Sequence, residues 1–179
     1  MAGLKMTEVK KHLQVMEKEE LVNEITQLIK LYPAVQEYYN LKLNPEAEKE
    51  ILAKYKKTVE NEFYPARGDG KMRHAVVKKA INDFKKVAKL PANIAELMLY
   101  YPKLGVEFTN QYGDIGKQFY EAIITGYDKA LQYISENNLE NLFRHEAGII
   151  MQKTVGIGWG FNETMSEIYE EYYYEDEEI

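Results

Sequence analysis

The sequence predicts an all-α protein, either a single-domain irregular antiparallel helical bundle or a short α-solenoid of about seven to nine helices. Three observations predict this class. Apolar residues recur at helical spacing along almost all of the 179 residues. No segment alternates apolar and polar residues as a half-buried strand would. The connections are short, which favours antiparallel packing of consecutive helices.

In the first half of the chain, apolar stripes alternate with prolines and polar loops. Pro33, Pro65 and Pro91 end the helices before them, because proline has no N–H to donate within a helix. Asn44 followed by Pro45 is typical of a helix start, with a capping side chain and then proline at the first helical position. The expected helices cover residues 9–16, 21–29, 35–39, 51–63 and 72–88.

The second half continues the same pattern with longer stripes. Pro102 lies inside the first of them, so we expect a kink or a break there. Thr164 and Glu167 have the spacing of a capping box, which predicts where the last helix begins. The expected helices cover residues 94–112, 115–134, 139–151 and 164–172.

Length and composition set the domain organisation and the compartment. A chain of this length suits one domain, which we place at residues 1–168, followed by an acidic, tyrosine-rich tail at 169–179 that is frayed or disordered. Without cysteine there are no disulfides and no thiolate metal sites. The first residues lack the apolar run of a signal peptide, and no stretch of about 18 apolar residues exists, so we expect a cytoplasmic protein without a membrane partner.

The charge is divided unevenly along the chain. Residues 1–90 hold 18 Lys and Arg against 13 Asp and Glu, whereas residues 91–179 hold 5 against 16. The basic segment offers an anion or nucleic-acid site, although solvated lysines on an amphipathic helix and the acidic total charge argue against nucleic acid. The candidate anion-binding residues are Arg67, Arg73, Lys78 and Lys79.

A glycine-rich stretch, TVGIGWGFNET at residues 154–164, contains the only tryptophan. It lacks the spacing and the preceding strand of a dinucleotide-binding loop. Gly156 can instead end the preceding helix with a positive φ. Trp159 is then either a plug on the core or an exposed anchor for a partner, flanked by Gly158 and Gly160, which let a partner's backbone approach.

A third candidate site is catalytic. Glu107 and Asp114 fall on one helix face, and with His74 in a shared cleft they could perform acid–base chemistry. The alternative, which we favour, is a polar network with Arg73 in which Asp114 caps the next helix. The three histidines lack metal-ligand spacing, so we expect no metal and no cofactor.

Three blocks of sequence resemble a family of small, uncharacterised bacterial helical proteins defined by a domain of unknown function. They are EFYPARGDGKMRHAVVKKAINDFKK, LMLYYPKLGVEFTNQYGDIGKQFYEAI and GIGWGFNETM. The resemblance covers about residues 4–165. It implies a helical protein and brings no activity, substrate, cofactor or functional residue.

The leading hypothesis is therefore a non-enzymatic helical module that binds a protein partner, or a second copy of itself, through Trp159. An anion- or nucleic-acid-binding protein that uses residues 67–89 is the first alternative, and an enzyme that uses Glu107, Asp114 and His74 is the second.

Overall fold

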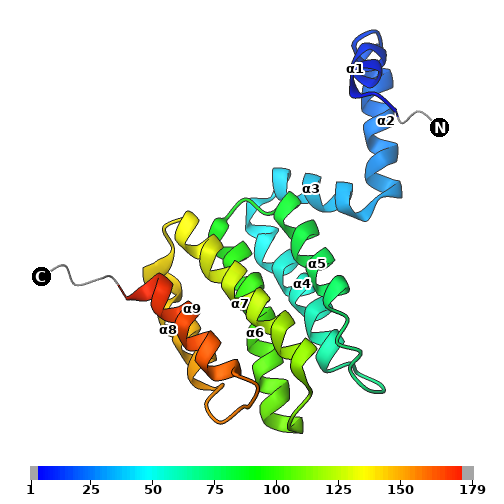
Figure 1. Cartoon of the computed structure of the whole chain (residues 1–179). Helices are drawn as coiled ribbons and strands as arrows, with labels where there is room; N and C mark the ends of the chain where they lie inside the picture. The colour runs from blue at the N-terminus through cyan, green and yellow to red at the C-terminus, as the bar shows by residue number, and fades with distance from the viewer. Residues whose placement is uncertain (1–3, 175–179) are drawn as a thin grey trace, which may run out of the picture. The chain divides into compact units, whose positions relative to one another are not determined.

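The computed structural model describes residues 4–174 and confirms the predicted all-α class (Figure 1). Within these residues there are nine α-helices, one short 3-10 helix and no strands. The helices fall into two compact units, residues 4–47 and residues 48–174.

The first unit contains three amphipathic helices that bury very little. Neither of the first two helices has a buried residue, and the third buries only Leu41. Apolar periodicity predicted these helices correctly, but it does not show whether another element covers the apolar face. The elements are α1 (Met6–Gln14), α2 (Lys18–Leu31), α3 (Pro33–Leu43) and the 3-10 turn η1 (Pro45–Ala47).

The second unit is a bundle of six helices with a continuous core. Helices α6 and α7 form its centre, with α4 and α5 packed on one side and α8 and α9 on the other (Figure 1). The elements are α4 (Glu48–Phe63), α5 (His74–Val87), α6 (Pro91–Tyr112), α7 (Lys117–Glu136), α8 (Glu140–Gln152) and α9 (Phe161–Tyr173).

Close approach of α6 to α7 depends on two glycines, one on each helix. A Cβ at Gly105 would overlap the side chain of Ile123, and a Cβ at Gly126 would lie 2.6 Å from ring carbons of Tyr101. Helix α6 also runs unbroken through Pro102, so the break that we considered there does not occur. Buried neighbours on both sides of Pro102 hold the helix together where proline removes one hydrogen bond.

A buried carboxylate joins the start of α4 to the start of α6. Glu48 is 3 % exposed and accepts hydrogen bonds from the backbone N–H groups of Lys89 and Leu90 at 3.0 and 3.1 Å. It also accepts one from the side-chain amide of Asn93 at 3.0 Å. These bonds satisfy donors at the start of α6, where the helix itself offers no acceptors.

Helix α9 begins at Phe161, three residues before the predicted capping box. The reason lies in packing, because Phe161 is fully buried and its ring lies 4.8 Å from that of Tyr120 on α7. At its other end the helix reaches Tyr173, which is 4 % exposed. The predicted end of this helix, residue 172, is one residue short of the observed end. Residues 175–179 of the expected tail lie outside the described part of the chain.

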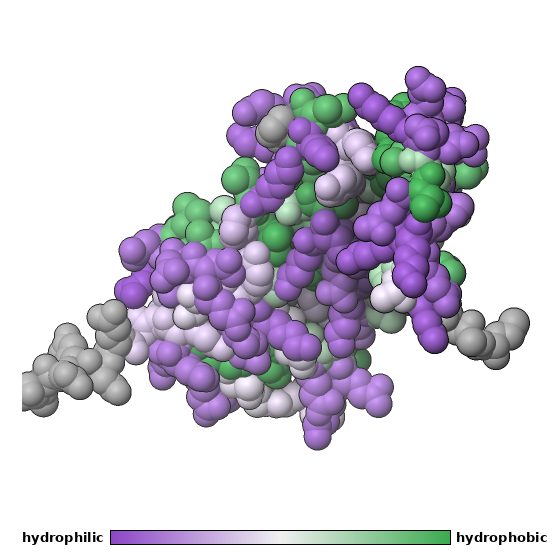
Figure 2. Space-filling model, turned by 90° about the horizontal axis from the view of Figure 1, so that it is seen from above, coloured by the Kyte–Doolittle hydropathy of each residue, from purple (hydrophilic) through white to green (hydrophobic). Residues whose placement is uncertain are grey.

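Exposed apolar side chains are scattered over the described surface. On the face seen in Figure 2, hydrophobic patches lie between hydrophilic side chains that cover most of the view. None of the described helices is both long enough and apolar enough to cross a bilayer.

Candidate functional site

The glycine-rich turn between α8 and α9 presents Trp159 to solvent. Its side chain is 63 % exposed, so it is not a plug on the core. The residue has a φ of +64°, a left-handed conformation that is uncommon for a bulky side chain. Gly156 and Gly160 also have positive φ values, of +85° and +68°. The backbone of the turn thus holds the indole outside the bundle.

Asp114 fixes the orientation of the indole. The Nε1–H of Trp159 lies 3.1 and 3.0 Å from the two carboxylate oxygens of Asp114 and donates to them. The hydroxyl of Tyr120 donates to the same carboxylate at 2.9 Å and accepts from the N–H of Ile115 at 3.2 Å. The hydrogen bonds from Trp159 and Tyr120 hold the pKa of Asp114 below its usual range, although partial desolvation opposes them.

This contact replaces the role that we expected for Asp114. The N-cap of α7 is Gly116, and no side chain caps that helix. The carboxylate of Asp114 instead links the end of α6 to the turn that follows α8. Only the fold brings these positions together, since 45 residues separate Asp114 from Trp159 along the chain.

A cavity of about 250 Å³ lies beside this contact. One wall of the cavity is fastened by Asn110, whose amide donates to the carbonyl of Lys153 at 2.8 Å. The turn is fastened internally by Asn162, whose amide donates to the hydroxyl of Thr154 at 2.8 Å. The lining combines backbone of the turn with polar side chains and comes from Thr109, Asn110, Gly113, Asp114, Tyr120, Val155, Gly156, Ile157 and Gly158.

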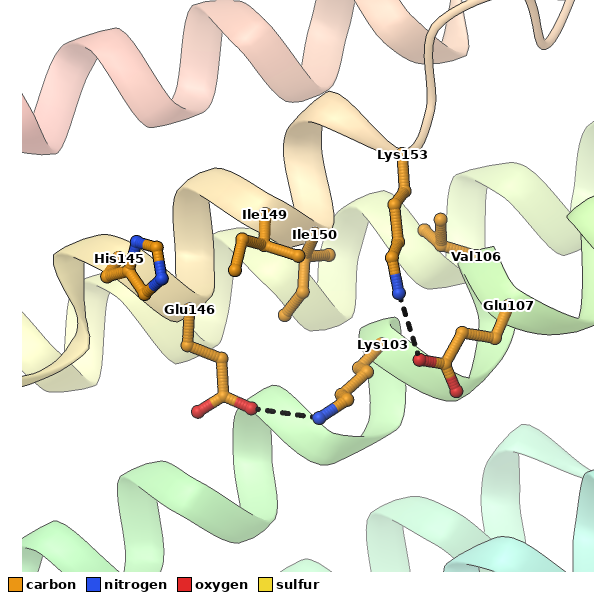
Figure 3. A pocket seen from close by; sticks show the side chains of 8 residues that line it. All are labelled: Lys103, Val106, Glu107, His145, Glu146, Ile149, Ile150 and Lys153. Carbon is orange, nitrogen blue, oxygen red and sulfur yellow. Dashed lines mark hydrogen bonds and ion pairs between the residues drawn. The ribbon is translucent and has the colours of Figure 1, made fainter.

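Glu107 lies in a different pocket, between α6 and α8 (Figure 3). The pocket has a volume of about 380 Å³. The Nζ of Lys153 lies 3.3 Å from a carboxylate oxygen of Glu107, and Lys103 pairs with Glu146 at the same distance. Apolar side chains, among them Ile149, line the space with these pairs (Figure 3). Each charge has an opposite partner, so the two ion pairs leave no net charge to select a ligand.

His74 occupies a third cavity, of about 500 Å³, near the start of α7. Its Nδ1 is hydrogen-bonded to the hydroxyl of Tyr101, and its ring packs on Phe119 with centroids 5.9 Å apart. Burial lowers the pKa of His74, and the nearby charge of Lys78 lowers it further. The structure therefore does not bring His74 together with Glu107 and Asp114, because the three line separate cavities.

Internal ion pairs engage much of the predicted anion-binding segment. Arg73 forms a bidentate pair with the buried Glu62, with N–O distances of 3.0 and 2.7 Å, and does not join Glu107 or Asp114. Lys79 and Lys86 both contact Asp83, at 2.5 and 2.8 Å. Each of these cations already has a carboxylate partner, although Lys79 and Lys86 share one, and this reduces what they offer to a phosphate.

Two of the predicted cations stay outside these pairs. Within residues 4–174 neither Arg67 nor Lys78 has an ion pair. Arg67 lies on an exposed loop, whereas Lys78 lines a groove together with Lys85 and with Lys129 of α7. Sequence reasoning missed Lys129, because no local pattern links it to a helix some 50 residues earlier.

Tyr120 was the other residue that sequence reasoning missed. It belongs to the apolar stripe of α7, where a tyrosine is expected to fill the core, and its ring is indeed 2 % exposed. Its hydroxyl nevertheless reaches the carboxylate of Asp114. The available signal was the abundance of tyrosine. A tyrosine ring commonly packs in the core while its hydroxyl forms a hydrogen bond at the edge of the core.

Comparisons with known proteins give a family but no activity. The model of a family of unknown function (DUF6155) matches residues 4–173 and so confirms the resemblance found in the sequence. The match extends beyond residue 165 and includes the C-terminal helix. No curated protein and no solved structure matches the chain. In the described part of the chain, no group of three or more His, Asp or Glu side chains could hold a metal ion.

Proposed function

The chain belongs to the family of unknown function DUF6155, and we propose that it is a protein-interaction module that holds a cationic side chain of a partner protein on Trp159. The observation that carries this proposal is the exposed indole, fixed by Asp114 at 3.0 Å. Tryptophan is one of the residue types enriched among those that dominate binding energy at protein interfaces.

The backbone of the turn supports a role in binding. A non-glycine residue in the left-handed region costs on the order of 1 kcal/mol and persists only where the surroundings enforce it. Trp159 adopts this conformation without gaining burial. Neither Gly156 nor Gly158 has a side chain, so the backbone of a partner can approach both the turn and the indole face. Core packing does not explain the left-handed backbone of Trp159, because the indole is exposed. A turn that presents the indole to a partner does explain it.

The charge of Asp114 indicates the chemistry of the partner. Among residues 4–174 no Lys, Arg or His forms an ion pair with this carboxylate. The residues from 91 onward carry 16 acidic side chains against 5 basic ones, which favours approach of a basic segment. An Arg or Lys side chain can stack on the indole face while its charge faces Asp114, and tryptophan is the best aromatic partner for such a contact.

The test uses a random peptide library displayed on phage and selected on the immobilised full-length protein. Peptides that also bind the Trp159→Ala variant are removed in each round. We expect the retained peptides to share an Arg or Lys beside an apolar residue. With one such peptide, Trp159→Ala should weaken binding about tenfold or more, because an interfacial tryptophan often contributes 2 kcal/mol or more.

Asp114→Asn separates charge from positioning. The asparagine oxygen still accepts a hydrogen bond from the indole N–H, but the negative charge is lost. We expect about three- to tenfold weaker binding of the same peptide, as measured by calorimetry. Leu142→Ala is the matched control, because Leu142 is an apolar side chain of α8 that is also 63 % exposed. It should leave the affinity unchanged.

Three results would overturn the proposal. The first is a set of selected peptides without basic residues, and the second is equal affinity of wild type and Asp114→Asn. The third is sedimentation of the wild-type protein as a dimer that Trp159→Ala dissociates, which would assign the turn to a second copy of the chain instead of a foreign partner.

A further inference from the structure

A narrow groove lies between α5, α6 and α7, on a part of the bundle that includes neither Trp159 nor Asp114. Its cavity volume is about 140 Å³. Each of the three helices contributes residues at helical spacing, so a single ligand in the groove would contact all three. The lining consists of Lys78, Ile81, Asn82 and Lys85 of α5, Met98 and Tyr101 of α6, and Thr125, Gly126 and Lys129 of α7.

Apolar side chains form the deep part of the groove. Met98 is 6 % exposed and Tyr101 is 3 % exposed, and the half-buried Ile81 lies with them. Gly126 is essential to this geometry, because a Cβ there would lie 2.6 Å from ring carbons of Tyr101. The hydroxyl of Tyr101 is hydrogen-bonded to His74, so the polar end of this side chain already has a partner. The floor therefore suits a small apolar group.

Three lysines line the groove, and none of the described residues that line it is acidic. Lys85 is held in place by Tyr133 of α7, with its Nζ 4.7 Å from the ring centroid. The nearby Asp83 does not neutralise the groove, because it contacts Lys79 and Lys86 instead. Three cations from two helices thus line one groove, and none of them forms an ion pair within residues 4–174.

The pKa of Lys85 is lowered, as expected for a partly buried amine beside another cation. Burial is the main cause that lowers the pKa of its amine, and the like charge of Lys129 lowers the pKa further. Glu136 of α7 acts in the opposite direction and offsets part of the effect. An anion placed among the lysines would relieve the repulsion between Lys85 and Lys129.

From this juxtaposition we propose that the groove binds a small amphipathic anion, with an apolar body of about the size of benzene and a carboxylate or phosphate head. An apolar cavity of about 150 Å³ accommodates benzene, which sets the size of the body. The body packs on Met98 and Tyr101, and the head lies among Lys78, Lys85 and Lys129. Neutral polar groups for the head are present in Asn82 and Thr125, which also line the groove.

The experiment follows the methyl resonance of Met98 in full-length protein labelled with ¹³C at its seven methionine methyl groups. The resonance is assigned by its loss in Met98→Leu. Benzoate and phenyl phosphate are the amphipathic probes, benzyl alcohol is the neutral analogue, and inorganic phosphate is the anion without an apolar body. We expect saturable shifts with at least one amphipathic probe, and about tenfold weaker binding of benzyl alcohol and of inorganic phosphate. The stronger of benzoate and phenyl phosphate identifies the head group.

Charge variants show whether the lysines bind the head. Lys85→Gln and Lys129→Gln should each lower the affinity for the tighter-binding probe by about three- to tenfold. Lys86→Gln is the matched control, since Lys86 lies on the same helix but pairs with Asp83 and does not line the groove. It should leave binding unchanged, and circular dichroism checks that every variant remains folded.

The proposal is wrong if the Met98 resonance does not respond to either amphipathic probe. It is also wrong if benzyl alcohol binds as well as benzoate, or if Lys86→Gln weakens binding as much as Lys129→Gln does. None of these results depends on the partner proposed for Trp159.

Discussion

Gly105 shows how much a single missing side chain contributes at the centre of the bundle. A Cβ at this position would lie 2.7 Å from Cγ1 of Ile123, whose side chain is fully buried in the core. We expect Gly105→Ala to lower the free energy of unfolding by about 1–3 kcal/mol, the usual cost of overpacking. Gly158→Ala is the control, because no atom lies within 4 Å of its added Cβ. Urea denaturation of both variants tests this, and equal stability of the two would contradict it.

At the residue scale, the sequence predicted which positions matter better than it predicted their contacts. It singled out Trp159, but it left open whether the indole is buried or exposed. The deciding contact is with Asp114, and no local pattern connects residues so far apart in the chain. Lys129 illustrates the same limit, because its position opposite α5 depends on how three helices pack.

The link between α4 and α5 depends on Glu62, and it should be sensitive to acid. Arg73 donates to this buried carboxylate from its side chain and also from its backbone N–H, at 3.0 Å. The side-chain hydrogen bond is the main cause that lowers the pKa of Glu62, while burial opposes it. Because the pKa is lower in the folded state, the link stabilises the protein above the pKa of unfolded glutamate and is lost as the pH falls through the folded value.

We therefore expect Glu62→Gln to lower the free energy of unfolding by about 2 kcal/mol at neutral pH. The difference from wild type should shrink as the pH falls from the pKa of unfolded glutamate, about 4.3, through the lower pKa of the folded carboxylate. Glu60→Gln is the matched control, since Glu60 lies on the same helix and pairs with the exposed Lys57. Thermal unfolding over a range of pH measures the stability of both variants relative to wild type. A difference that does not depend on pH would rule out this role for the charge of Glu62.

At the element scale, prolines and apolar stripes predicted the order of the helices and most of their ends. The start of α9 was misplaced because Phe161 begins the helix by packing on Tyr120, a tertiary contact that outweighs the capping signal at Thr164. Helix α6 continued through Pro102 for the same kind of reason, as its neighbours on both sides are buried.

The two units of the chain should differ in how readily their helices open. Helices α1 and α2 bury no residues, whereas α6 buries twelve. Opening free energy follows the amount of buried apolar contact, so backbone amides of α1 and α2 should exchange with solvent about a hundredfold faster, or more, than those of α6. Hydrogen exchange read by mass spectrometry tests this, and equal protection of α2 and α6 would contradict it.

For the molecule as a whole, the sequence predicted the all-α class but not which helices bury their apolar faces. Periodicity shows that a helix has an apolar face, but it gives no information about what covers that face. Val22 and Leu28 belong to the clear stripe of α2, and both are more than a third exposed. Burial is a property of the complete fold, so the exposure of α1 and α2 could not be predicted from the pattern alone.

The exposed position of Trp159 also separates the two natural chromophores of the protein. The single indole lies at the surface, whereas Tyr127 is fully buried and donates to the carbonyl of Ala147. Indole emission should already be red-shifted in the native protein and should change little when the bundle melts. Near-ultraviolet ellipticity from the tyrosines should instead follow the loss of the core, so the two optical signals report on different parts of the same molecule.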